Sequence, residues 1–414
     1  MTVPDVHHSA VSKTGELLGP APVRAGVICD YVEEQWPSMD LVGDMLCQSL
    51  AQDSSIGVEV TQLRPTRRRR FSRLPLLGEA VSTNADRLLS RFWDYPHWLA
   101  KEVSRFDVFH IVDHSYSHLL HGLPAGRTVV TCHDLDTFRC LLEPTREPRP
   151  GWFRFMTARI LDGFRKAAYV IAVSEATRAE LLHYGLAPAD RIRVIPNGVH
   201  PAYTQLADPI EDAEARRLLA ADSPQDVWLL NVGSNAPRKR LDLLLQVFAA
   251  VRREAPGVRL ARVGGPLTEQ QRRTARQLGV EDAIVTLPFL SFARLAAVYR
   301  RATLLLHTAD AEGFGLPLVE AMACGCPVVA SDLPVLREVA GPGAVFCPVG
   351  EISAWAESIQ LLVNGREKEN SRWKAQQQLG IRRSALYQWT TSARETAQVY
   401  REILGESGRD SAGI

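Results

Sequence analysis

The sequence predicts an α/β protein with two parallel sheets, and three observations lead to this class. Short apolar runs rich in Val, Ile and Leu alternate with longer amphipathic segments along nearly the whole chain. These runs are apolar on both faces, as in parallel strands that helices cover from both sides. There are about twelve runs, more than one sheet comfortably holds, and a polar stretch at mid-chain separates them into two sets.

The expected strands form two groups of six. In the first half we expect strands within 24–30, 56–63, 106–112, 127–133, 167–174 and 191–196. In the second half we expect them within 226–234, 257–265, 283–289, 302–308, 326–331 and 343–348. Helical periodicity fills the intervals and is clearest in 240–254 and 291–302. Alternating strands and helices predict sheets with helices on both faces.

The same pattern divides the chain into segments. Residues 1–22 mix Pro, Gly, Ser and His without an apolar core, and we expect a flexible leader there. A first domain of 23–204 and a second of 226–380 each hold six expected strands. The polar, acidic stretch 205–225 lacks a strand and is interpreted as the linker between them. A single (β/α)₈ barrel is the alternative, which the long interruption at mid-chain disfavours.

The composition excludes several classes of protein. With 46% hydrophobic and 23% charged residues, the chain of 414 residues has the balance of a soluble globular protein. Its net charge of +1 lacks the basic excess of a general nucleic-acid binder, so we expect no nucleic-acid partner. No run approaches the roughly 18 apolar residues of a membrane helix. The seven cysteines fit reduced thiols, and together these features predict a cytoplasmic protein.

Two carboxylates stand in an oily, glycine-punctuated stretch, "AEGFGLPLVEAMACGCPVVAS", at 311–331. Glu312 lies in the loop after an expected strand, and Glu320 lies in a short helix that Pro317 starts and Gly325 stops. Burying a carboxylate without a partner is costly, so either a cation of the fold or a ligand with hydroxyls and phosphates must compensate. The helix N-terminus beside them favours anions and could bind a phosphate. The alternative is a structural salt bridge for Glu320 and a solvated Glu312.

This stretch closely resembles the Glu-x₇-Glu signature of the retaining glycosyltransferases of family four. Other segments resemble the same family: "VVTCHDLDTF", "YVIAVSEATRAELLHYGLAPADRIRVIPNGV", "LNVGSNAPRKRLDLLLQVFAAV" and "LYQWTTSARETAQVYREIL". Together they cover most of 106–404. The resemblance implies a GT-B fold, in which two Rossmann-like domains face an interdomain cleft. It also implies that 381–414 holds a closing helix, packed back on the N-terminal domain, followed by a tail.

The resemblance implies a donor site for a nucleotide-diphosphate sugar. Glu320 would accept hydrogen bonds from the ribose hydroxyls, and Glu312 would contact the transferred sugar as a catalytic residue. Lys239 would stabilise the leaving diphosphate. Backbone N–H groups of the donor loop would face the sugar and diphosphate, from Gly313, Phe314, Gly315 and Leu316. We expect no cofactor besides this donor substrate and no metal, since Cys324-Gly-Cys326 has no second ligand pair.

The chain departs from the family pattern at Ser234, where many relatives carry an arginine that binds the donor. This departure leaves the site one cation short unless Arg238 or Arg240 turns inward. Consecutive residues at a helix start cannot all face one ligand, and Arg238 is the preferred candidate. The alternative for both arginines is a solvated helix end.

On the acceptor side, the resemblance makes His133 a catalytic residue that hydrogen-bonds the donor sugar, with Asp134 beside it. The loop after the first strand departs most from the family. Here a Trp-Pro-Ser-Met turn at 36–39 replaces a Gly-Gly turn, and Ser38 and Met39 would touch donor or acceptor. The segment that holds His110, Asp113 and His114 is interpreted as cleft lining. Without the resemblance, His133 would be interpreted as a structural residue, as a lone histidine after a strand usually is.

One dense basic cluster, "RPTRRRRFSRLP" at 64–75, is followed by the aromatic residues Phe92, Trp93 and Trp98. In a chain near neutrality this cluster points to a partner. The sequence predicts that the protein contacts the anionic inner face of a membrane through Arg67, Arg68, Arg69 and Arg70. The alternatives are a solvated loop and, for the aromatic residues, a helix core.

The resulting prediction is a retaining, metal-independent hexosyltransferase. It would move a mannose- or glucose-type sugar from a nucleotide-diphosphate donor to a hydroxyl acceptor. Candidate acceptors are a lipid-linked glycan and a polysaccharide precursor. The alternatives are a GT-B nucleotide-sugar epimerase and a non-catalytic protein that binds nucleotide sugars.

Overall fold

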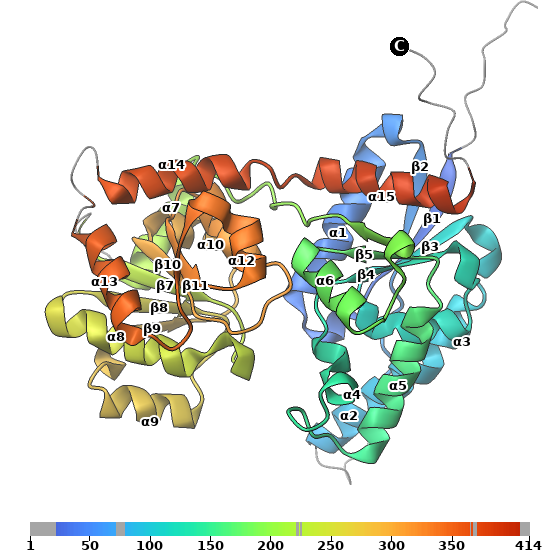
Figure 1. Cartoon of the computed structure of the whole chain (residues 1–414), viewed down its shortest axis with the longest axis horizontal. Coiled ribbons are helices and arrows are strands. Elements are labelled where there is room, and N and C mark those ends of the chain that lie inside the picture. Colours follow the sequence, from blue (N-terminus) through green and yellow to red (C-terminus); the bar gives the residue numbers. More distant parts are fainter. Residues whose placement is uncertain are drawn as a thin grey trace, which may run out of the picture.

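The computed structural model describes residues 22–71, 79–220, 223, 226–364, 366 and 371–405. It contains two six-stranded sheets, one in each half of the chain (Figure 1). The first has the strand order β2-β1-β3-β4-β5-β6 and the second the order β12-β11-β10-β7-β8-β9. All neighbouring strands run parallel, so the predicted fold class is confirmed. The expected leader lies outside the described residues except for residue 22.

Each strand lies in or overlaps an expected segment. The first sheet consists of β1 Val23–Ile28, β2 Val58–Leu63, β3 Val108–Ile111, β4 Thr128–Cys132, β5 Tyr169–Ala172 and β6 Ile192–Val194. The second consists of β7 Trp228–Val232, β8 Arg259–Val263, β9 Ile284–Leu287, β10 Leu304–His307, β11 Val328–Ser331 and β12 Ala344–Cys347. The central strands β3, β4, β10 and β11 are buried along their whole length, as expected of runs that are apolar on both faces.

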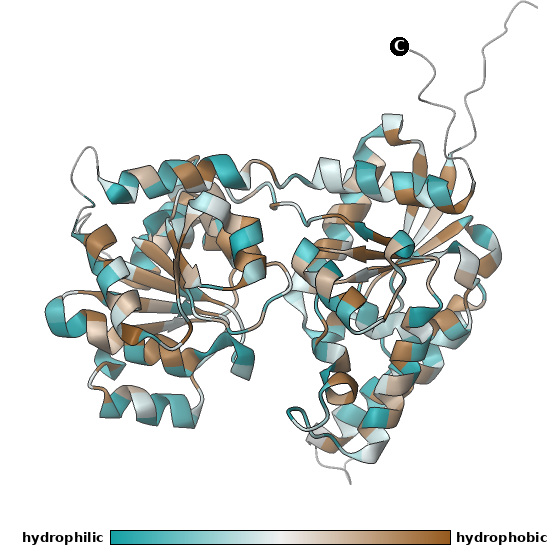
Figure 2. Cartoon of the chain, in the orientation of Figure 1, coloured by the Kyte–Doolittle hydropathy of each residue, from teal (hydrophilic) through white to brown (hydrophobic). Residues whose placement is uncertain are grey.

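Helices cover both faces of each sheet (Figure 1). Those of the first half are α1 Pro37–Gln52, α2 Glu79–Leu89, α3 Tyr95–Leu99, α4 Arg139–Leu142, α5 Gly151–Arg165 and α6 Glu175–His183. The others are α7 Pro209–Leu219, α8 Leu241–Glu254, α9 Glu269–Gln277, α10 Phe292–Arg301, α11 Leu316–Ala323, α12 Pro334–Ala340, α13 Ile352–Val363, α14 Arg372–Ser384 and α15 Trp389–Ile403. The periodicity of 240–254 and 291–302 correctly predicted α8 and α10. Figure 2 shows hydrophobic residues concentrated on the strands and on the helix faces turned toward them.

The last helix returns to the first half of the chain. Helix α14 lies over the second sheet, whereas α15 lies beside α1 and the first sheet (Figure 1). Trp389 and Tyr400 of α15 belong to the same buried cluster as Val27 of β1. The Tyr400 hydroxyl lies 2.7 Å from Nδ1 of His110, whose Nε2 lies 2.7 Å from Oγ1 of Thr131. The interpretation of His110 as cleft lining is therefore wrong, because this ring joins the sheet to α15.

The segment interpreted as a linker contains a helix. In α7 the Asp208 carboxylate accepts hydrogen bonds from the first N–H groups, and Pro209 occupies the first position. Ala215 and Leu219 are fully buried against the core that α10 helps to build. Arg300 of α10 lies 2.6 Å from the Asp212 carboxylate. Residues 208–219 therefore belong to the second half, and the apolar side of α7 was too narrow to reveal this in the sequence.

The chain passes between the two halves near residues 196–199 and again near 387–392, and these two segments lie side by side. The N–H of Val199 donates to the carbonyl of Tyr387 at 2.9 Å. A Cβ added at Gly198 would lie 2.3 Å from the backbone nitrogen of Trp389, so only glycine permits this approach. The Ser392 hydroxyl donates to the Pro196 carbonyl at 2.5 Å. The two segments are thus fixed to each other at the start of α15.

Candidate functional site

Helix α11 has the form that its glycines and proline predicted. Gly315, with a φ of 90°, is the residue before the helix, and Pro317 lies in its first turn. Gly325 has a φ of 76° just after the helix, where a residue with a side chain would be strained. The loop 308–315 joins β10 to α11 and carries Glu312. This local geometry places Glu312 before the helix N-terminus and Glu320 inside the helix.

Three basic side chains surround Glu312, whose side chain is only 8% exposed. Lys239 forms an ion pair with Oε1, Nη1 of Arg238 lies 3.2 Å from Oε2, and Nε2 of His307 lies 2.8 Å from Oε1. Burial raises the pKa of this carboxyl, but the charge of Lys239 and the hydrogen bond from His307 together hold it well below its ordinary value. Glu312 is therefore an ionised carboxylate that the cations of the fold compensate.

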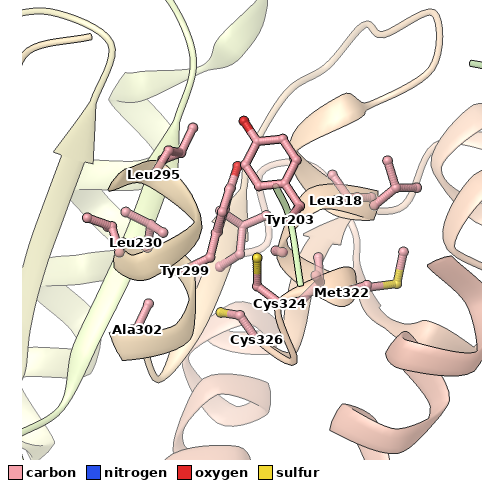
Figure 3. Packing of buried hydrophobic residues seen from close by; sticks show 14 of the residues in the cluster. Tyr203, Leu230, Leu295, Tyr299, Ala302, Leu318, Met322, Cys324 and Cys326 are labelled. Atoms are coloured by element: carbon pink, nitrogen blue, oxygen red, sulfur yellow. The ribbon is translucent and has the colours of Figure 1, made fainter. Parts of the chain in front are cut away.

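Glu320 is buried in a different way. The Tyr299 hydroxyl donates to its Oε2 at 2.9 Å, and no salt bridge to Glu320 is found among the described residues. Burial raises its pKa to about 7, while hydrogen bonds from Tyr299 and Tyr203 lower it only in part. Figure 3 shows the two tyrosines packed with Leu318 and Cys324 around the end of α10. The alternative of a structural salt bridge for Glu320 is therefore wrong, and the two tyrosine hydroxyls offset only part of the cost of burying this carboxyl.

The cations come from the turn between β7 and α8. The Thr308 hydroxyl, on the chain that follows β10, donates to the carbonyl of Lys239 at 3.0 Å and fixes this turn. Arg238 turns inward, since its Nε lies 2.7 Å from the Asp136 carboxylate while its Nη1 reaches Glu312. Arg240 turns away and lies 2.8 Å from Asp242. Of the two candidates for a second cation, Arg238 is the one beside Glu312.

Ser234 is exposed, and its hydroxyl accepts a hydrogen bond from Ala236 at 3.4 Å. The neighbouring Gly233 has a φ of 148°, and a Cβ there would lie 3.8 Å from the Lys239 side chain. The side chain of Lys239 therefore lies close to the backbone of the turn at Gly233. Ser234 adds a small hydroxyl to the surface of the turn, with no charge.

The donor loop contacts the first half of the molecule at Gly313. A Cβ added to this residue would lie 1.6 Å from the carbonyl oxygen of His133, so the two backbones approach as closely as glycine permits. The Ser174 hydroxyl donates to the Gly313 carbonyl at 2.9 Å. Phe314 is buried, with its ring centroid 5.4 Å from that of Tyr387. The carboxyl ends of β4 and β10, which belong to different sheets, are thereby brought together.

His133 is fixed within the first half. Its Nε2 lies 2.8 Å from the Val112 carbonyl, and only 8% of the residue is exposed. Burial lowers its pKa, although Asp113 raises it in part. The ring is therefore neutral near pH 7. Asp134, the next residue, lies 3.8 Å from Nη2 of Arg238 and so also contacts the cations of the second half.

The prediction for 36–39 as a turn is wrong. Pro37 occupies the first position of α1, so Ser38 and Met39 belong to the first helical turn. Ser38 is exposed and Met39 half-buried. A proline after Trp36 is equally typical of a turn and of a helix start, which explains the error. Gly43 lies inside α1, where a Cβ would come within 2.7 Å of the Cys29 sulfur.

The sequence did not single out several polar residues at this interface. His307 ends β10 and could have been noticed there, since strand ends of open sheets carry ligand contacts. Asp30, which follows β1, is buried close enough to Asp113 for the two carboxyls to affect each other's pKa. Burial and the neighbouring charge of Asp113 raise the pKa of Asp30 well above its ordinary value. Nothing in the sequence near Asp30 indicates this pairing.

The described residues contain neither a cluster of metal ligands nor a membrane-spanning helix. No group of three or more His, Cys, Asp or Glu side chains in them is arranged to hold a metal ion. None of the helices described is both long enough and apolar enough to span a bilayer.

Two family models match the chain. The model "Glycosyltransferase Family 4" matches residues 45–203, and "Glycosyl transferases group 1" matches residues 220–379. The chain belongs to the glycosyltransferases of family four. The first model covers most of the half that carries His133, and the second covers the half with Lys239 and both glutamates.

Among curated relatives, D-inositol 3-phosphate glycosyltransferase of Segniliparus rotundus is 33% identical over 243 residues, which are 57% of this chain and 52% of the relative. The chain thus spans about half the length of that relative. Among solved structures, sucrose-phosphate synthase from Thermosynechococcus elongatus has a TM-score of 0.71 at 20% identity, covering 93% of this chain and all of that one. HepE of Anabaena in complex with UDP and glucose has a TM-score of 0.66 at 18% identity, covering 92% of this chain and 100% of that one. These structural neighbours are GT-B glycosyltransferases, so the fold is of the GT-B type.

Proposed function

We propose that this protein transfers a hexose from a nucleotide-diphosphate sugar to a hydroxyl acceptor, with retention of configuration and without a metal. The observation that carries the proposal is the ionised Glu312, held between Lys239 and Arg238 just before the N-terminus of α11. Two cations and a helix N-terminus would form a site for a diphosphate. The HepE complex with UDP and glucose supports a nucleotide sugar as the donor class.

The ion pairs of the free protein suggest how such a donor would bind. A diphosphate would attract Lys239 and Arg238 away from Glu312, and hydroxyls of the hexose would replace them as hydrogen-bond donors to this carboxylate. Glu320 would lose its proton and accept hydrogen bonds from the ribose hydroxyls. The buried acids would thus exchange partners within the protein for partners on the donor.

In the proposed reaction, the bond between the anomeric carbon and the diphosphate oxygen breaks while the acceptor oxygen bonds to the same carbon. The proton of the acceptor hydroxyl passes to the departing diphosphate, which leaves on the same face. Lys239, Arg238 and the N–H groups of Gly315 and Leu316 would stabilise the charge that grows on the diphosphate. The Glu312 carboxylate would stabilise the positive charge that develops on the sugar ring. His133, neutral and fixed, would donate or accept a hydrogen bond to the sugar.

A donor screen followed by product analysis tests this proposal. We expect one nucleotide-diphosphate hexose to raise the melting temperature, because a ligand at 100 times its Kd adds about 2.7 kcal/mol of stability. With that donor and no acceptor, slow release of free hexose should follow, and NMR of the first product should show the anomeric configuration of the donor. A product with inverted configuration would refute retention. Interconversion of the donor with its C2 epimer would identify an epimerase, and binding without any turnover a non-catalytic protein.

A further inference from the structure

The segment that follows β2 lines an open hollow on the first half of the molecule. Its walls come from Glu33, Thr66 and the four arginines 67–70. The volume is about 560 Å³, within the range of small-molecule sites. We propose that this hollow binds a phosphate group of the acceptor. The proposal rests on the proposed function, and it narrows the acceptor to molecules that carry both a hydroxyl and a phosphate.

The charges of this hollow are unevenly compensated. Arg70 is fixed by Asp94, whose two carboxylate oxygens accept hydrogen bonds at 2.6 and 2.8 Å. In contrast, Arg67, Arg68 and Arg69 form no ion pair within the described part of the chain. The Nε atom of Arg67 is buried and has no hydrogen-bond partner among the described residues. A buried guanidinium nitrogen without an acceptor is costly, and an anion in the hollow would supply the acceptor.

The backbone of the hollow is held in place. The Asp86 carboxylate of α2 accepts hydrogen bonds from the N–H groups of Arg70 and Phe71, at 2.9 and 2.8 Å. Asp86 lies 16 positions after Arg70 and 15 after Phe71, so these contacts fix the segment to a separate helix. Arginine is suited to such a site, because its planar fork matches the oxygens of a phosphate. A pre-formed cluster of this kind binds an anion without first ordering a loop.

The carboxylates near the hollow do not cancel its charge. Glu34 accepts from Arg87 at 2.6 Å and lies 3.5 Å from Arg91, so its charge is already compensated. Glu33, the wall residue, forms no ion pair in the described part of the chain. Among the described residues, one carboxylate faces three arginines that form no ion pair there, which leaves a net positive site. Glu33 would also be available as an acceptor for a hydroxyl of the same ligand.

The hollow lies at the edge of the first sheet that the carboxyl ends of its parallel strands form, where ligands of such sheets bind. Glu33 follows the carboxyl end of β1, and the arginines follow the carboxyl end of its neighbour β2. His133 follows the carboxyl end of β4 in the same sheet and meets the donor loop there. Parallel strands end on one edge, so the hollow and the donor loop share that edge. A phosphate held by the arginines would direct the rest of the acceptor along this edge.

Phe92 and Trp98 pack against the core of the first half, while Trp93 is 59% exposed. Two sources of phosphate share the proposed chemistry. One is a soluble phosphomonoester and the other is a lipid headgroup. Residues 72–75 of the basic cluster lie outside the described residues.

Calorimetry on the full chain tests the proposal. The donor site is first saturated with the nucleoside diphosphate that best raises the melting temperature, so that the probe cannot enter it. Inorganic phosphate and glycerol 3-phosphate are then titrated into wild type, R68A/R69A and the control R272A/R273A. The control removes two charges from α9, where Arg272 and Arg273 are exposed. We expect wild type and control to bind glycerol 3-phosphate equally, and the R68A/R69A affinity to fall about tenfold or more.

Equal affinity in R68A/R69A and wild type, or no phosphate binding by wild type, would overturn the proposal. The nucleoside diphosphate titration separates this result from a failure of the proposed function, since all three proteins should bind the nucleotide alike. Vesicles of phosphatidylglycerol and of phosphatidylcholine distinguish the two sources. Sedimentation with phosphatidylglycerol alone, reversed by inorganic phosphate and lost in R68A/R69A, supports a headgroup. Phosphate binding without sedimentation supports a soluble phosphomonoester.

Discussion

Lys239 and Glu312 form an ion pair that joins the turn after β7 to the loop after β10. The two strands are neighbours in the second sheet, so their carboxyl ends present this pair together. His307 lies 2.8 Å from the same carboxylate oxygen and is itself buried. In the free protein the cation and the acid therefore satisfy each other, and the proposed donor would separate them.

Replacing Lys239 with alanine should slow turnover more than it weakens donor binding. The charge on the diphosphate grows as the sugar departs, so the ammonium stabilises the transition state more than the bound donor. We expect kcat to fall about a hundredfold, similar to the loss of one donor group that stabilises a developing anion. Steady-state kinetics and donor titration measure the two effects separately.

Arg240→Ala is the matched control, because Arg240 leaves the same turn but pairs with Asp242. It should keep kcat within about threefold of wild type, which is roughly 0.6 kcal/mol. A Lys239→Ala variant that stays within the same limit would show that another cation holds the leaving group, and Arg238 would then be tested.

Donor affinity should depend on pH through Glu320. Burial raises the pKa of this carboxyl to about 7, and only its ionised form can accept two ribose hydroxyls. Below pH 7 the donor must therefore displace a proton, so affinity should fall about tenfold for each further pH unit. Titrations between pH 6 and 8 in buffers of different ionisation enthalpy would report the proton released. In Glu320→Gln the affinity should be weaker and nearly independent of pH; unchanged affinity would refute the ribose contact.

The same carboxyl should make wild type less stable as the pH rises. Its pKa is about 7 when folded, compared with 4.5 ordinarily, so below pH 4.5 both states are protonated and this group makes no pH-dependent contribution to stability. Between pH 4.5 and 7 the unfolded chain loses the proton first, which favours unfolding. The loss amounts to about 3 kcal/mol in total, at about 1.4 kcal/mol per pH unit.

Urea unfolding of wild type and Glu320→Gln at a series of pH values isolates this effect. Glutamine has no proton to lose, so the variant should gain stability relative to wild type from pH 4.5 to 7 and keep the difference above pH 7. The comparison with the variant removes the contribution of Glu312, whose pKa is shifted in the opposite direction. A constant difference across the range would mean that Glu320 is ionised in the folded protein.

The strands and the site helix were predictable because their signals are local. A parallel strand covered on both faces needs a continuous apolar run, and α11 needs a glycine and a proline at its start and a glycine at its end. Helix α7 was missed because half of the residues in 208–219 are charged and only Ala215 and Leu219 are fully buried. The sequence showed its polar character and gave no sign of the surface that it covers.

The partners of the buried groups were not predictable in the same way. His110 and Tyr400 are 290 positions apart, and only the return of α15 to the first sheet brings them together. The two glutamates share one motif, yet cations hold the pKa of Glu312 well below its ordinary value, whereas burial between tyrosines raises that of Glu320 to about 7. These states depend on Lys239, Arg238 and Tyr299, which reach the acids from other elements.

A methyl group at Gly313 should separate the two halves of the site. Its Cβ would lie 1.6 Å from the His133 carbonyl oxygen, which is backbone and cannot rotate away. We expect Gly313→Ala to retain both folded halves but to lose at least about a hundredfold in kcat/KM, since a displacement of about 1 Å can cost that much. Gly126→Ala is the control, because nothing lies within 4 Å of a Cβ there. Small-angle scattering with and without donor should show a more open average shape for Gly313→Ala than for Gly126→Ala. Equal scattering and equal kinetics in the two variants would mean that the contact between Gly313 and His133 is not part of the working conformation.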